Sequence, residues 1–554
     1  MHFSDKILSQ TVTQLCLDSG VTSVVISPGS RNAPLTIGFT LDNHFNCYSI
    51  VDERCAAFFA LGIAQQTQKP VALVCTSGSA LLNYYPAIAE AFYSDIPLVV
   101  ISADRPEHLI EVGDGQTIMQ ENVYGKHILY NANCKEGKNS QSYNEEEIGK
   151  ALIKAVNEKG PVHINVPFSE PLYNTSEKRN ITTSLKIPKK KTTLIYDELD
   201  SVFTNWNKAE KKMILVGVLP PNSIEEKIIN KLAANESVLV LTETTSNLKH
   251  SNFINAIDQL IAPLTQDGFM QLQPDILLSF GGMVVSKKIK AFLRNFPPKF
   301  HYHVDAKKAY NTYFTLDKHV KTTPSLFLKE LLNKSTPISS TYRDTWLAVK
   351  SKRLQGHNTY LNNIPFSDFS VYESIVKNLS KPLQLQLANS TAIRYSQLFT
   401  LPSDVEVFCN RGTSGIDGST STAIGAAVAS KLQTLYITGD LSFFYDSNAL
   451  WNNYIPSNFR IILLNNKGGG IFRILPKAKE SAHFTTFFET KHDLTAKQLC
   501  ELFNFDYLVA KTKEQTESAL KEFYKVSEKP RLLEVFTPSE INDEVLLSYF
   551  KAIK

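Results

Sequence analysis

Short apolar runs rich in β-branched residues alternate with helical stretches along most of this chain, and each run ends in a polar loop. In the first third of the chain the runs occupy residues 21–26, 71–75, 98–101 and 162–166, with helical stretches such as 53–65 and 80–93 between them. Strands that alternate with helices in this way form a parallel sheet with helices on both faces. The pattern therefore predicts an α/β fold whose ligand lies at the loops that follow the strands.

The same alternation recurs twice further along the chain. The later apolar runs occupy 213–216, 238–242, 276–280 and 302–304, and then 384–387, 406–408, 435–437, 461–464 and 532–536. A chain of 554 residues is too long for a single hydrophobic core. Stretches rich in Ser, Thr, Lys or Pro at 174–193, which include Lys189 to Lys191, and at 335–341 indicate linkers. We predict three domains, each a mainly parallel sheet flanked by helices, at residues 1–175, 195–335 and 355–554.

The composition excludes several classes of protein. A net charge of +4 over 554 residues gives no reason to expect a nucleic-acid partner. The seven cysteines form no C-x-x-C pair, which argues against a disulfide framework or a zinc site and fits a reducing compartment. The first 20 residues carry Asp5, Lys6 and Asp18 among spaced apolar residues, a pattern typical of an amphipathic helix and not of a signal peptide. Since no apolar run approaches the roughly 18 residues that span a bilayer, we expect a cytoplasmic protein without integral membrane association.

Two polar motifs in the third block indicate a metal site. The first, Gly-Asp-Leu-Ser at 439–442, follows the apolar run 435–437, and the second, Asn-Asn-Lys-Gly-Gly-Gly at 465–470, follows the run 461–464. The carboxylate of Asp440, the side-chain oxygen of Asn466 and a nearby backbone carbonyl can hold Mg²⁺, which takes oxygen ligands and usually keeps a substrate phosphate in its shell. Amides at the start of a helix expected at 446–451 would receive the diphosphate. The alternative is that both motifs are ordinary turns.

Glu53 lies at the start of the expected helix 53–65. An acidic residue at this position can simply complement the helix dipole. The functional alternative is that Glu53 is buried against a heterocycle and shares a proton with a ring nitrogen, because burial raises the pKa of a carboxyl group and suits it to that task. The residues around Glu53 leave both interpretations open.

Together these features resemble the thiamine diphosphate enzymes, which have a pyrimidine-binding domain with a glutamate and a diphosphate-binding domain with a Gly-Asp…Asn motif. A closer resemblance is to the menaquinone-pathway synthases that make 2-succinyl-5-enolpyruvyl-6-hydroxy-3-cyclohexene-1-carboxylate (SEPHCHC). The specific matches are Ser-Pro-Gly-Ser-Arg-Asn-Ala-Pro-Leu at 27–35 and Asn-Arg-Gly-Thr-Ser-Gly-Ile-Asp-Gly at 410–418. Weaker matches are Asp-Glu-Arg at 52–54, Thr-Ser-Gly at 76–78, Ser-Ala-Asp-Arg-Pro at 102–106, a basic pair at 287–288 and Gly-Gly-Gly-Ile-Phe at 468–472.

The resemblance implies the fold, the cofactors and the reaction. It implies a thiamine diphosphate-binding fold of three α/β domains, with thiamine diphosphate and Mg²⁺ or Mn²⁺ as cofactors. The implied reaction is decarboxylation of 2-oxoglutarate followed by 1,4-addition of the resulting succinyl carbanion to isochorismate, which gives SEPHCHC and CO₂. Such a transferase needs no Ser, Cys or His nucleophile, because the cofactor supplies the electron sink.

The resemblance also implies roles for individual residues. Glu53 would drive formation of the imino tautomer of the aminopyrimidine, and Ile416 would lie between the two rings of the cofactor. The residues expected to bind the cofactor are Glu53, Ser390, Ile416, Gly439, Asp440, Ser442, Asn466, Gly468 and Ile471, and the expected metal ligands are Asp440, Asn466 and Gly468. The residues expected to act near the reacting centre are Glu53, Ser30, Arg31 and Gln116.

Both substrates implied by the resemblance are dicarboxylates, and arginine can bind a carboxylate through two parallel hydrogen bonds. The residues expected to bind the substrates are Ser30, Arg31, Arg105, Gln116, Lys287, Arg394, Arg411 and Phe472. For any one arginine the alternative is a structural salt bridge or a solvated surface charge. For Lys287 the alternative is a charged helix start, because lysine lacks the planar fork of arginine.

In such enzymes the pyrimidine-binding domain of one subunit faces the diphosphate-binding domain of another. We therefore expect a homodimer or a dimer of dimers, in which Glu53 and Asp440 serve one cofactor from different chains. Two rivals stay open. One is another thiamine diphosphate enzyme, either a simple 2-oxoacid decarboxylase or an acetolactate-type synthase, some of which add a flavin in the middle domain. The other is a non-catalytic α/β nucleotide-binding or scaffold protein.

Overall fold

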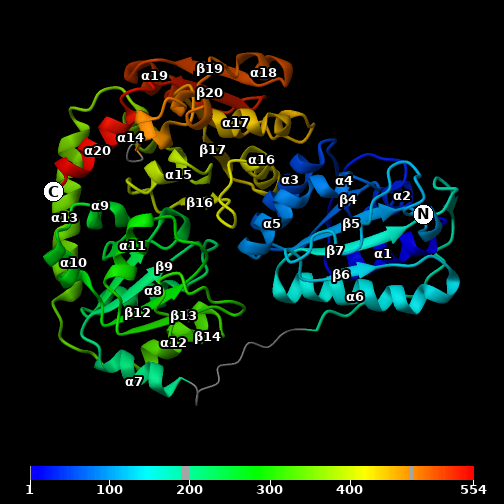
Figure 1. Cartoon of the computed structure of the whole chain (residues 1–554), viewed down its shortest axis with the longest axis horizontal. Coiled ribbons are helices and arrows are strands. Elements are labelled where there is room, and N and C mark those ends of the chain that lie inside the picture. The colour runs from blue at the N-terminus through cyan, green and yellow to red at the C-terminus, as the bar shows by residue number, and fades with distance from the viewer. Residues whose placement is uncertain (1, 189–198, 475–477) are drawn as a thin grey trace.

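A computed structural model describes residues 2–188, 199–474 and 478–554. These residues form three six-stranded sheets with parallel neighbours and one short antiparallel pair, β1 (Phe3–Ser4) with β8 (Thr175–Ser176). Figure 1 shows the first sheet in blue and cyan, the second in green and the third in yellow to red. The predicted α/β class is confirmed, whereas the exact domain limits stay a prediction. Lys189 to Lys191, assigned to a linker, lie outside the described residues.

The first sheet is built from residues 23–167. In spatial order its strands are β3 (Asn46–Ser49), β2 (Ser23–Ile26), β4 (Val71–Cys75), β5 (Leu98–Asp104), β7 (Val162–Pro167) and β6 (Asn131–Asn133). Its helices are α1 (Ile7–Asp18), α2 (Ala33–Thr40), α3 (Glu53–Thr67), α4 (Ala80–Asn83), α5 (Tyr85–Ser94) and α6 (Gln141–Glu158). The single helix predicted at 80–93 is wrong, since it divides at Tyr84. The division follows from Pro86, which has no N–H to bond the carbonyl of Leu82.

The second sheet is built from residues 212–320. In spatial order its strands are β11 (Phe253–Ile254), β10 (Val238–Thr242), β9 (Lys212–Val216), β12 (Ile276–Phe280), β13 (Phe300–Val304) and β14 (Lys318–Val320). Its helices are α7 (Asp200–Lys208), α8 (Glu226–Ala234), α9 (Ile257–Ile261), α10 (Gln266–Leu272), α11 (Lys287–Asn295) and α12 (Pro324–Lys334). The loops after β9 and β12 are in contact: the N–H of Gly217 donates to Phe280 and that of Gly282 donates to Val218.

The third sheet is built from residues 383–536. In spatial order its strands are β16 (Val405–Cys409), β15 (Leu383–Leu387), β17 (Gln433–Gly439), β18 (Phe459–Asn465), β20 (Arg531–Phe536) and β19 (Asp506–Ala510). Its helices are α14 (Asp368–Lys377), α15 (Thr391–Ser396), α16 (Ser419–Ala429), α17 (Asp440–Tyr445), α18 (Lys497–Leu502), α19 (Lys513–Phe523) and α20 (Asn542–Ala552), and α13 (Tyr342–Leu361) precedes them. The helix predicted at 446–451 begins instead at Asp440, and 447–450 form a short 3₁₀ helix. The carboxylate of Asp440 explains the earlier start, because it accepts the N–H of Leu441 in the first turn.

Helices α3 and α16 join the first and third domains along their length (Figure 1). A Cβ added to Gly62 of α3 would lie 2.1 Å from the carbonyl oxygen of Thr422. A Cβ added to Gly425 of α16 would lie 2.0 Å from the carbonyl oxygen of Phe59. These distances are far below ordinary contact, so the two backbones approach as closely as only glycine permits.

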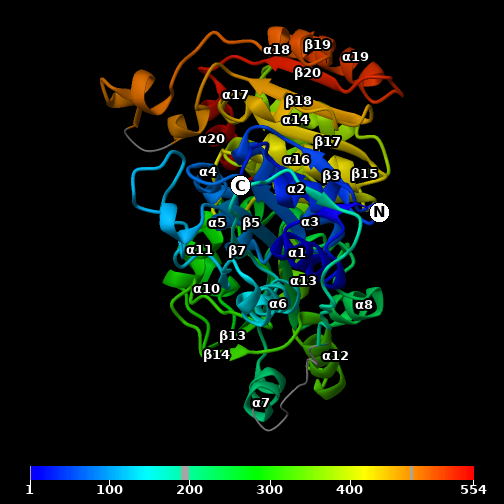
Figure 2. The ribbon, with the colours of Figure 1, turned by 90° about the vertical axis from the view of Figure 1, so that its right-hand side faces the viewer.

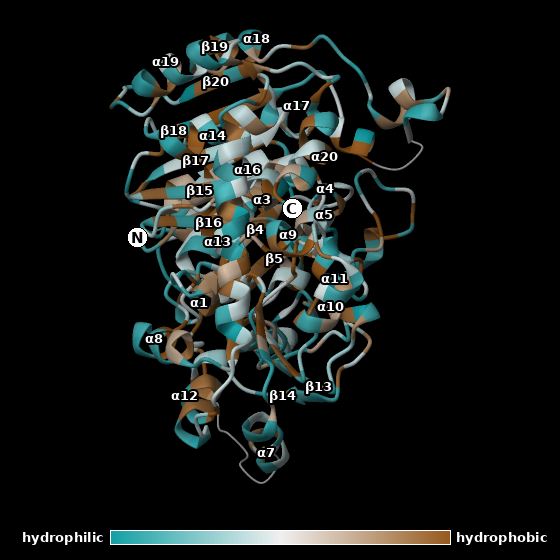
Figure 3. Cartoon of the chain, turned by 90° about the vertical axis from the view of Figure 1, so that its left-hand side faces the viewer, coloured by the Kyte–Doolittle hydropathy of each residue, from teal (hydrophilic) through white to brown (hydrophobic). Residues whose placement is uncertain are grey.

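The central strands carry the apolar core. All residues of β4, β5, β9, β10, β12, β15 and β18 are buried. Figure 3 shows the same separation of an apolar interior from a polar exterior, with brown (hydrophobic) concentrated on strands and teal (hydrophilic) on the outer faces of the helices. Strands covered by helices on both faces read as continuous apolar runs, which is why the sequence located them. Among the described helices, none combines the length and hydrophobicity needed to span a bilayer.

Candidate active site

The predicted metal pair comes together at the carboxyl edge of the third sheet. Strand β17 pairs with β18 so that Gly439 lies opposite Leu464, and both motifs leave the sheet at the same point. The side chain of Asp440 is buried, with the residue 2 % exposed. One of its carboxylate oxygens accepts the N–H of Leu441 at 2.7 Å, and the other accepts the N–H of Gly468 at 2.9 Å. A direct hydrogen bond therefore joins the two motifs.

The amide nitrogen of Asn466 is bonded, whereas no hydrogen bond to its side-chain oxygen is found among the described residues. Nδ2 of Asn466 donates to Oδ2 of Asp368 at 2.9 Å. The carbonyl of Gly468 accepts the N–H of Gly470 at 2.9 Å, which uses one of its two lone pairs. A carboxylate, an amide oxygen and a backbone carbonyl form the kind of oxygen set that Mg²⁺ or Mn²⁺ binds, so the residues present fit such a cation. Within the described residues no group of three or more His, Cys, Asp or Glu side chains offers another metal site.

These loops flank the point where the strand order of the third sheet reverses. Connections leave β15 and β17 in opposite directions, which opens a crevice between the carboxyl ends of the two strands. Ser390 follows β15, and Gly439 and Asp440 follow β17. Ser390 has φ 67° and ψ −126°, a strained conformation of the kind that clusters at functional sites. A Cβ on Gly439 would meet no atom within 4 Å, so the space beside it is open.

Ile416 lies on a loop that is fixed to the same crevice. Its carbonyl accepts the hydroxyl of Ser442 at 2.7 Å, while the residue is 38 % exposed. The loop is anchored by Asn389, whose amide donates to the carbonyls of Asn410 at 2.8 Å and Gly415 at 2.7 Å. An exposed apolar side chain on an anchored loop suits the predicted position between two rings, which stays a prediction.

The glycine loop after β18 packs against a later segment of the chain. The N–H of Gly469 donates to the carbonyl of Glu489 at 2.6 Å. A Cβ on Gly468 would lie 2.5 Å from the same carbonyl oxygen, so this approach requires glycine. Ile471 and Phe472 follow in a short 3₁₀ helix over 470–474 and are partly exposed. Both therefore remain accessible beside the crevice.

Arg394 and Arg411 form a positive site beside this crevice. The guanidinium of Arg394 donates to the carbonyl of Ser390, and that of Arg411 donates to Oδ1 of Asn389, each at 2.6 Å. In the described part of the chain neither arginine has a carboxylate partner within 4 Å. Burial and the neighbouring charge of Arg411 lower the pKa of Arg394. Two guanidinium groups without paired carboxylates can receive an acidic substrate.

The loops of the first domain that carry predicted residues also lie together. Strands β2 and β4 flank the reversal of strand order in the first sheet. A Cβ on Gly29, beside Ser30, would lie 2.3 Å from the Cβ of Thr76. A Cβ on Gly78 would lie 3.2 Å from the carbonyl of Gln116, which is exposed and has φ 55°. The loops after β2 and β4 and the loop that follows β5 therefore converge on one edge.

The two predicted arginines of the first domain are partly engaged within the protein. Arg31 donates to the carbonyl of Phe168 at 2.7 Å and forms an ion pair of 3.2 Å with Glu170. Arg105 donates to the carbonyl of Gly115 at 3.0 Å and so supports the loop that carries Gln116. The Nε of each is buried without a hydrogen-bond partner. A structural role is present for both, and a substrate role stays a prediction.

Glu53 begins α3 and is only partly buried. Its carboxylate accepts Nδ2 of Asn83 at 3.3 Å. Its neighbour Arg54 donates to the carbonyl of Tyr445, at the end of α17 opposite Asp440. Among the hydrogen bonds and ion pairs of the described residues, none joins Glu53 to Asp440. The sequence predicts that both residues serve one cofactor, and within the described chain no hydrogen bond or ion pair links them.

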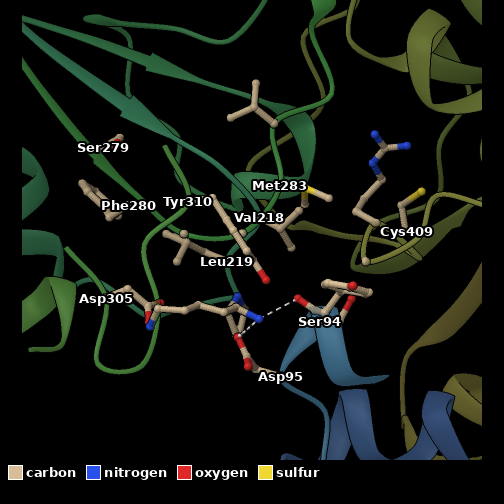
Figure 4. A pocket seen from close by; sticks show the side chains of 18 of the residues that line it. Ser94, Asp95, Val218, Leu219, Ser279, Phe280, Met283, Asp305, Tyr310 and Cys409 are labelled. Carbon is tan, nitrogen blue, oxygen red and sulfur yellow. Dashed lines mark hydrogen bonds and ion pairs between the residues drawn. The ribbon is translucent and has the colours of Figure 1, made fainter. Parts of the chain in front are cut away.

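A cavity of about 310 Å³ lies where the three domains meet (Figure 4). Its lining includes Ser94 and Asp95 of the first domain, Val218, Leu219, Phe280 and Met283 of the second, and Cys409 of the third. Lys290 and Arg411 also line it, and burial lowers the pKa of Lys290. The predicted Lys287 starts α11, is exposed, and is not a lining residue. Of the lysines of α11, Lys290, one helical turn later, lines this space, as do Lys159 and Lys308 from other segments.

Several residues that contact the site were not selected from the sequence. Asp368 bonds to Asn466, and Nε2 of His492 lies 3.5 Å from a carboxylate oxygen of Asp440. Glu90 of α5 accepts the backbone N–H groups of Gly412 and Thr413 at 2.7 and 2.6 Å. The local sequence around Asp368 signals only a helix start, because Ser367 caps α14. These contacts depend on tertiary structure.

Comparison with known protein families agrees with this arrangement. Residues 7–127 match the family described as "Thiamine pyrophosphate enzyme, N-terminal TPP binding domain". Residues 391–535 match the family described as "Thiamine pyrophosphate enzyme, C-terminal TPP binding domain". The first match contains Glu53, and the second contains Asp440 and Asn466. The chain therefore carries both halves of a thiamine diphosphate-binding arrangement.

Curated relatives match the chain along its whole length. A protein of Flavobacterium psychrophilum named 2-succinyl-5-enolpyruvyl-6-hydroxy-3-cyclohexene-1-carboxylate synthase is 57% identical over 547 residues, which is 98% of each chain. Proteins with the same name from Christiangramia forsetii and Phocaeicola vulgatus are 54% and 38% identical, over 100% of this chain and 100% and 99% of theirs. The similarity thus includes the middle domain as well as the two cofactor-binding domains. The chain belongs to the 2-succinyl-5-enolpyruvyl-6-hydroxy-3-cyclohexene-1-carboxylate synthase family of thiamine diphosphate enzymes.

Proposed function

We propose that this chain catalyses the decarboxylation of 2-oxoglutarate and the 1,4-addition of the resulting four-carbon unit to isochorismate, forming SEPHCHC and CO₂ in menaquinone biosynthesis. The observation that carries the proposal is the position of Arg394 and Arg411. Both guanidinium groups are bonded to consecutive residues, Ser390 and Asn389, at the crevice where the Asp440 loop begins. An acid held there lies beside the cofactor loops.

The proposed cation is Mg²⁺ or Mn²⁺, held by the carboxylate of Asp440, the side-chain oxygen of Asn466 and the carbonyl of Gly468. Thiamine diphosphate, when bound, stabilises the carbanion that decarboxylation produces. Ile416 and Ser442, which are bonded to each other, would support its rings and diphosphate beside the open space at Gly439. The protein's part is to bind the cofactor, orient the acids and hold the proton at Glu53.

Recognition of two dicarboxylates requires several positive groups. Arg394 and Arg411 lack carboxylate partners within 4 Å in the described chain, so they can bind acid groups through two parallel hydrogen bonds. The partly exposed Phe472 offers an apolar surface for a ring. We assign Ser30 and Gln116 as hydrogen-bond donors near the reacting centre, since both are exposed on the converging loops of the first domain.

We also propose a homodimer or a dimer of dimers, in which Glu53 of one chain completes the site of another. Figure 2 shows the segment 478–490, in orange, and the loop 107–120, in light blue, projecting to the same side. These segments expose large apolar side chains, namely Phe487, Met119 and Val112. Exposed apolar groups on site loops suit a surface that a second copy covers.

The test is an assay that contains 2-oxoglutarate, isochorismate, thiamine diphosphate and Mg²⁺. Isochorismate absorbance should fall only when all four are present. Glu53→Gln should abolish this loss while cofactor binding, measured by calorimetry, is largely retained. Glu146→Gln, on the exposed face of α6, is the matched control and should keep full activity. Failure of the parent enzyme to consume isochorismate would refute the substrates, and consumption of pyruvate in place of 2-oxoglutarate would favour an acetolactate-type synthase.

A further inference from the structure

We infer that Asp368 is a positioning residue that fixes which end of the Asn466 amide faces the metal. The inference rests on the proposed cation site at Asp440, Asn466 and Gly468. Asp368 is the first residue of α14, far from the Gly-Asp and Asn-Lys-Gly motifs in sequence. No feature of the sequence connects it with them.

An asparagine side chain has two ends of similar size and opposite hydrogen-bonding character. Its oxygen can bind a cation, whereas its NH₂ group repels one. Rotation by 180° about the last side-chain bond exchanges the two ends. A site that uses Asn466 as a ligand therefore needs a neighbour that accepts from Nδ2 and rejects Oδ1.

Asp368 meets this requirement. Its carboxylate is buried, with the residue 1 % exposed, and Oδ2 accepts Nδ2 of Asn466 at 2.9 Å. An ionised carboxylate has only acceptors, so it bonds the NH₂ end of the amide and cannot bond the oxygen end. The oxygen of Asn466 is then left for the cation.

The carboxylate of Asp368 is itself held by its surroundings. Its other oxygen accepts the hydroxyl of Thr537, which follows β20, and its backbone N–H donates to Oδ1 of Asn542 at 2.9 Å. Asn542 begins the C-terminal helix α20. Three separate segments therefore place one carboxylate behind one metal ligand, as outer-shell partners of metal sites do.

The reversal of donor and acceptor provides a direct experiment. Asp368→Asn is nearly the same size but adds an NH₂ group that can bond Oδ1 of Asn466, which favours the wrong end of the amide. Mn²⁺ affinity, measured by electron paramagnetic resonance in the presence of thiamine diphosphate, should fall about 10–100-fold, as is usual when an outer-shell partner is lost. Compared with Asn466→Asp alone, which already carries the extra ligand charge, the double variant Asp368→Asn with Asn466→Asp should bind Mn²⁺ at least as tightly, because a carboxylate ligand has no NH₂ end to turn toward the metal.

Asp267→Asn is the matched control, because it makes the same substitution in the first turn of another helix, α10, where the side chain is exposed. It should change Mn²⁺ affinity by less than about threefold, whereas loss of an outer-shell partner costs about 10–100-fold. An equal loss of affinity in Asp267→Asn and Asp368→Asn, or an equal loss when Asp368→Asn is made in the Asn466→Asp background, would overturn the orienting role. If the parent enzyme binds Mn²⁺ no more tightly than the Asp368→Asn variant does, this inference alone is overturned. Parent enzyme that binds no Mn²⁺ would overturn the proposed cation site and this inference with it.

Discussion

The contact between α3 and α16 allows a quantitative prediction about how the first and third domains are held together. Gly62→Ala and Gly425→Ala each place a methyl group about 2 Å from a carbonyl oxygen of the facing helix, at 2.1 and 2.0 Å respectively. Ordinary contact begins at 3.4 Å, so the helices must separate by more than an ångström. Because both clashing groups are backbone atoms, no side-chain rotation can relieve the clash.

The size of the effect follows from two opposed terms. Alanine in a helix interior is favoured over glycine by about 0.5–1 kcal/mol. Overpacking of a well-packed interface costs about 1–3 kcal/mol, and more when backbone must move. The separated helices also lose a quarter to a half of the dispersion energy of each contact across a gap of this size. We therefore expect each substitution to destabilise the protein by roughly 2 kcal/mol or more.

Gly149→Ala provides the control, because Gly149 lies inside α6 and a Cβ there would meet only Leu185, at 3.4 Å. This variant should be as stable as the parent or about 0.5–1 kcal/mol more stable. Urea unfolding of the cofactor-free protein, followed by circular dichroism, measures the midpoint of each transition. If Gly62→Ala unfolds at the same urea concentration as Gly149→Ala, the close packing of α3 on α16 is not as described.

Three further predictions concern pH, a buried arginine and a substrate contact. Burial raises the pKa of Asp446 from 3.8 to about 6, so the stability that its protonated form contributes is complete below about pH 4 and lost as the pH rises through about 6. Asp446→Asn should remove this loss. The difference in free energy of unfolding between parent and variant should therefore fall between pH 4 and 7, and a constant difference would contradict the prediction. Arg460 is fully buried and donates to four backbone carbonyls, so Arg460→Met should cost about 3 kcal/mol or more in urea unfolding, and an unchanged midpoint would contradict this. Arg394→Lys should raise the KM for one acid substrate about tenfold, which corresponds to about 1.4 kcal/mol. Calorimetry should show an unchanged affinity for thiamine diphosphate. A parallel loss of cofactor affinity would instead indicate damage to the Ser390 loop.

The sequence predicts central strands well and most edge strands poorly. Strand β4 begins and ends at the predicted residues 71 and 75, because a strand covered on both faces is an unbroken apolar run. Strand β6 is Asn-Ala-Asn and β14 is Lys-His-Val, and neither contains a pattern that separates it from a loop. These strands exist because a neighbouring strand offers unpaired hydrogen-bonding groups at the sheet edge, which only the fold determines.

In the candidate site, likewise, some residues could be predicted from the sequence and others could not. The juxtaposition of Asp440 and Asn466 was predictable because each comes within three residues of the end of an apolar run, and adjacent parallel strands end at the same edge. Asp368 was not predictable, since its bond to Asn466 connects positions 98 residues apart and the surrounding residues indicate only a helix cap. The sequence shows the basic pair 287–288 but not which face of α11 borders the cavity, so it gave no indication that Lys290 lines it; the substrate role of Lys287 stays a prediction.

The hydrogen-bonded junction of the loops after β9 and β12 bears on how the middle domain can hold a ligand. These strands flank the reversal of strand order in the second sheet, where open α/β folds ordinarily bind dinucleotides. A bound dinucleotide needs free amide groups and space for its diphosphate at this point. Here the N–H groups of Gly217 and Gly282 are consumed by Phe280 and Val218, and a Cβ on Gly217 would lie 1.9 Å from the carbonyl of Gly282. The cavity of about 310 Å³ opens beside this junction, so a ligand there must be held by side chains such as Lys290 and Arg411 and not by the backbone N–H groups of Gly217 and Gly282.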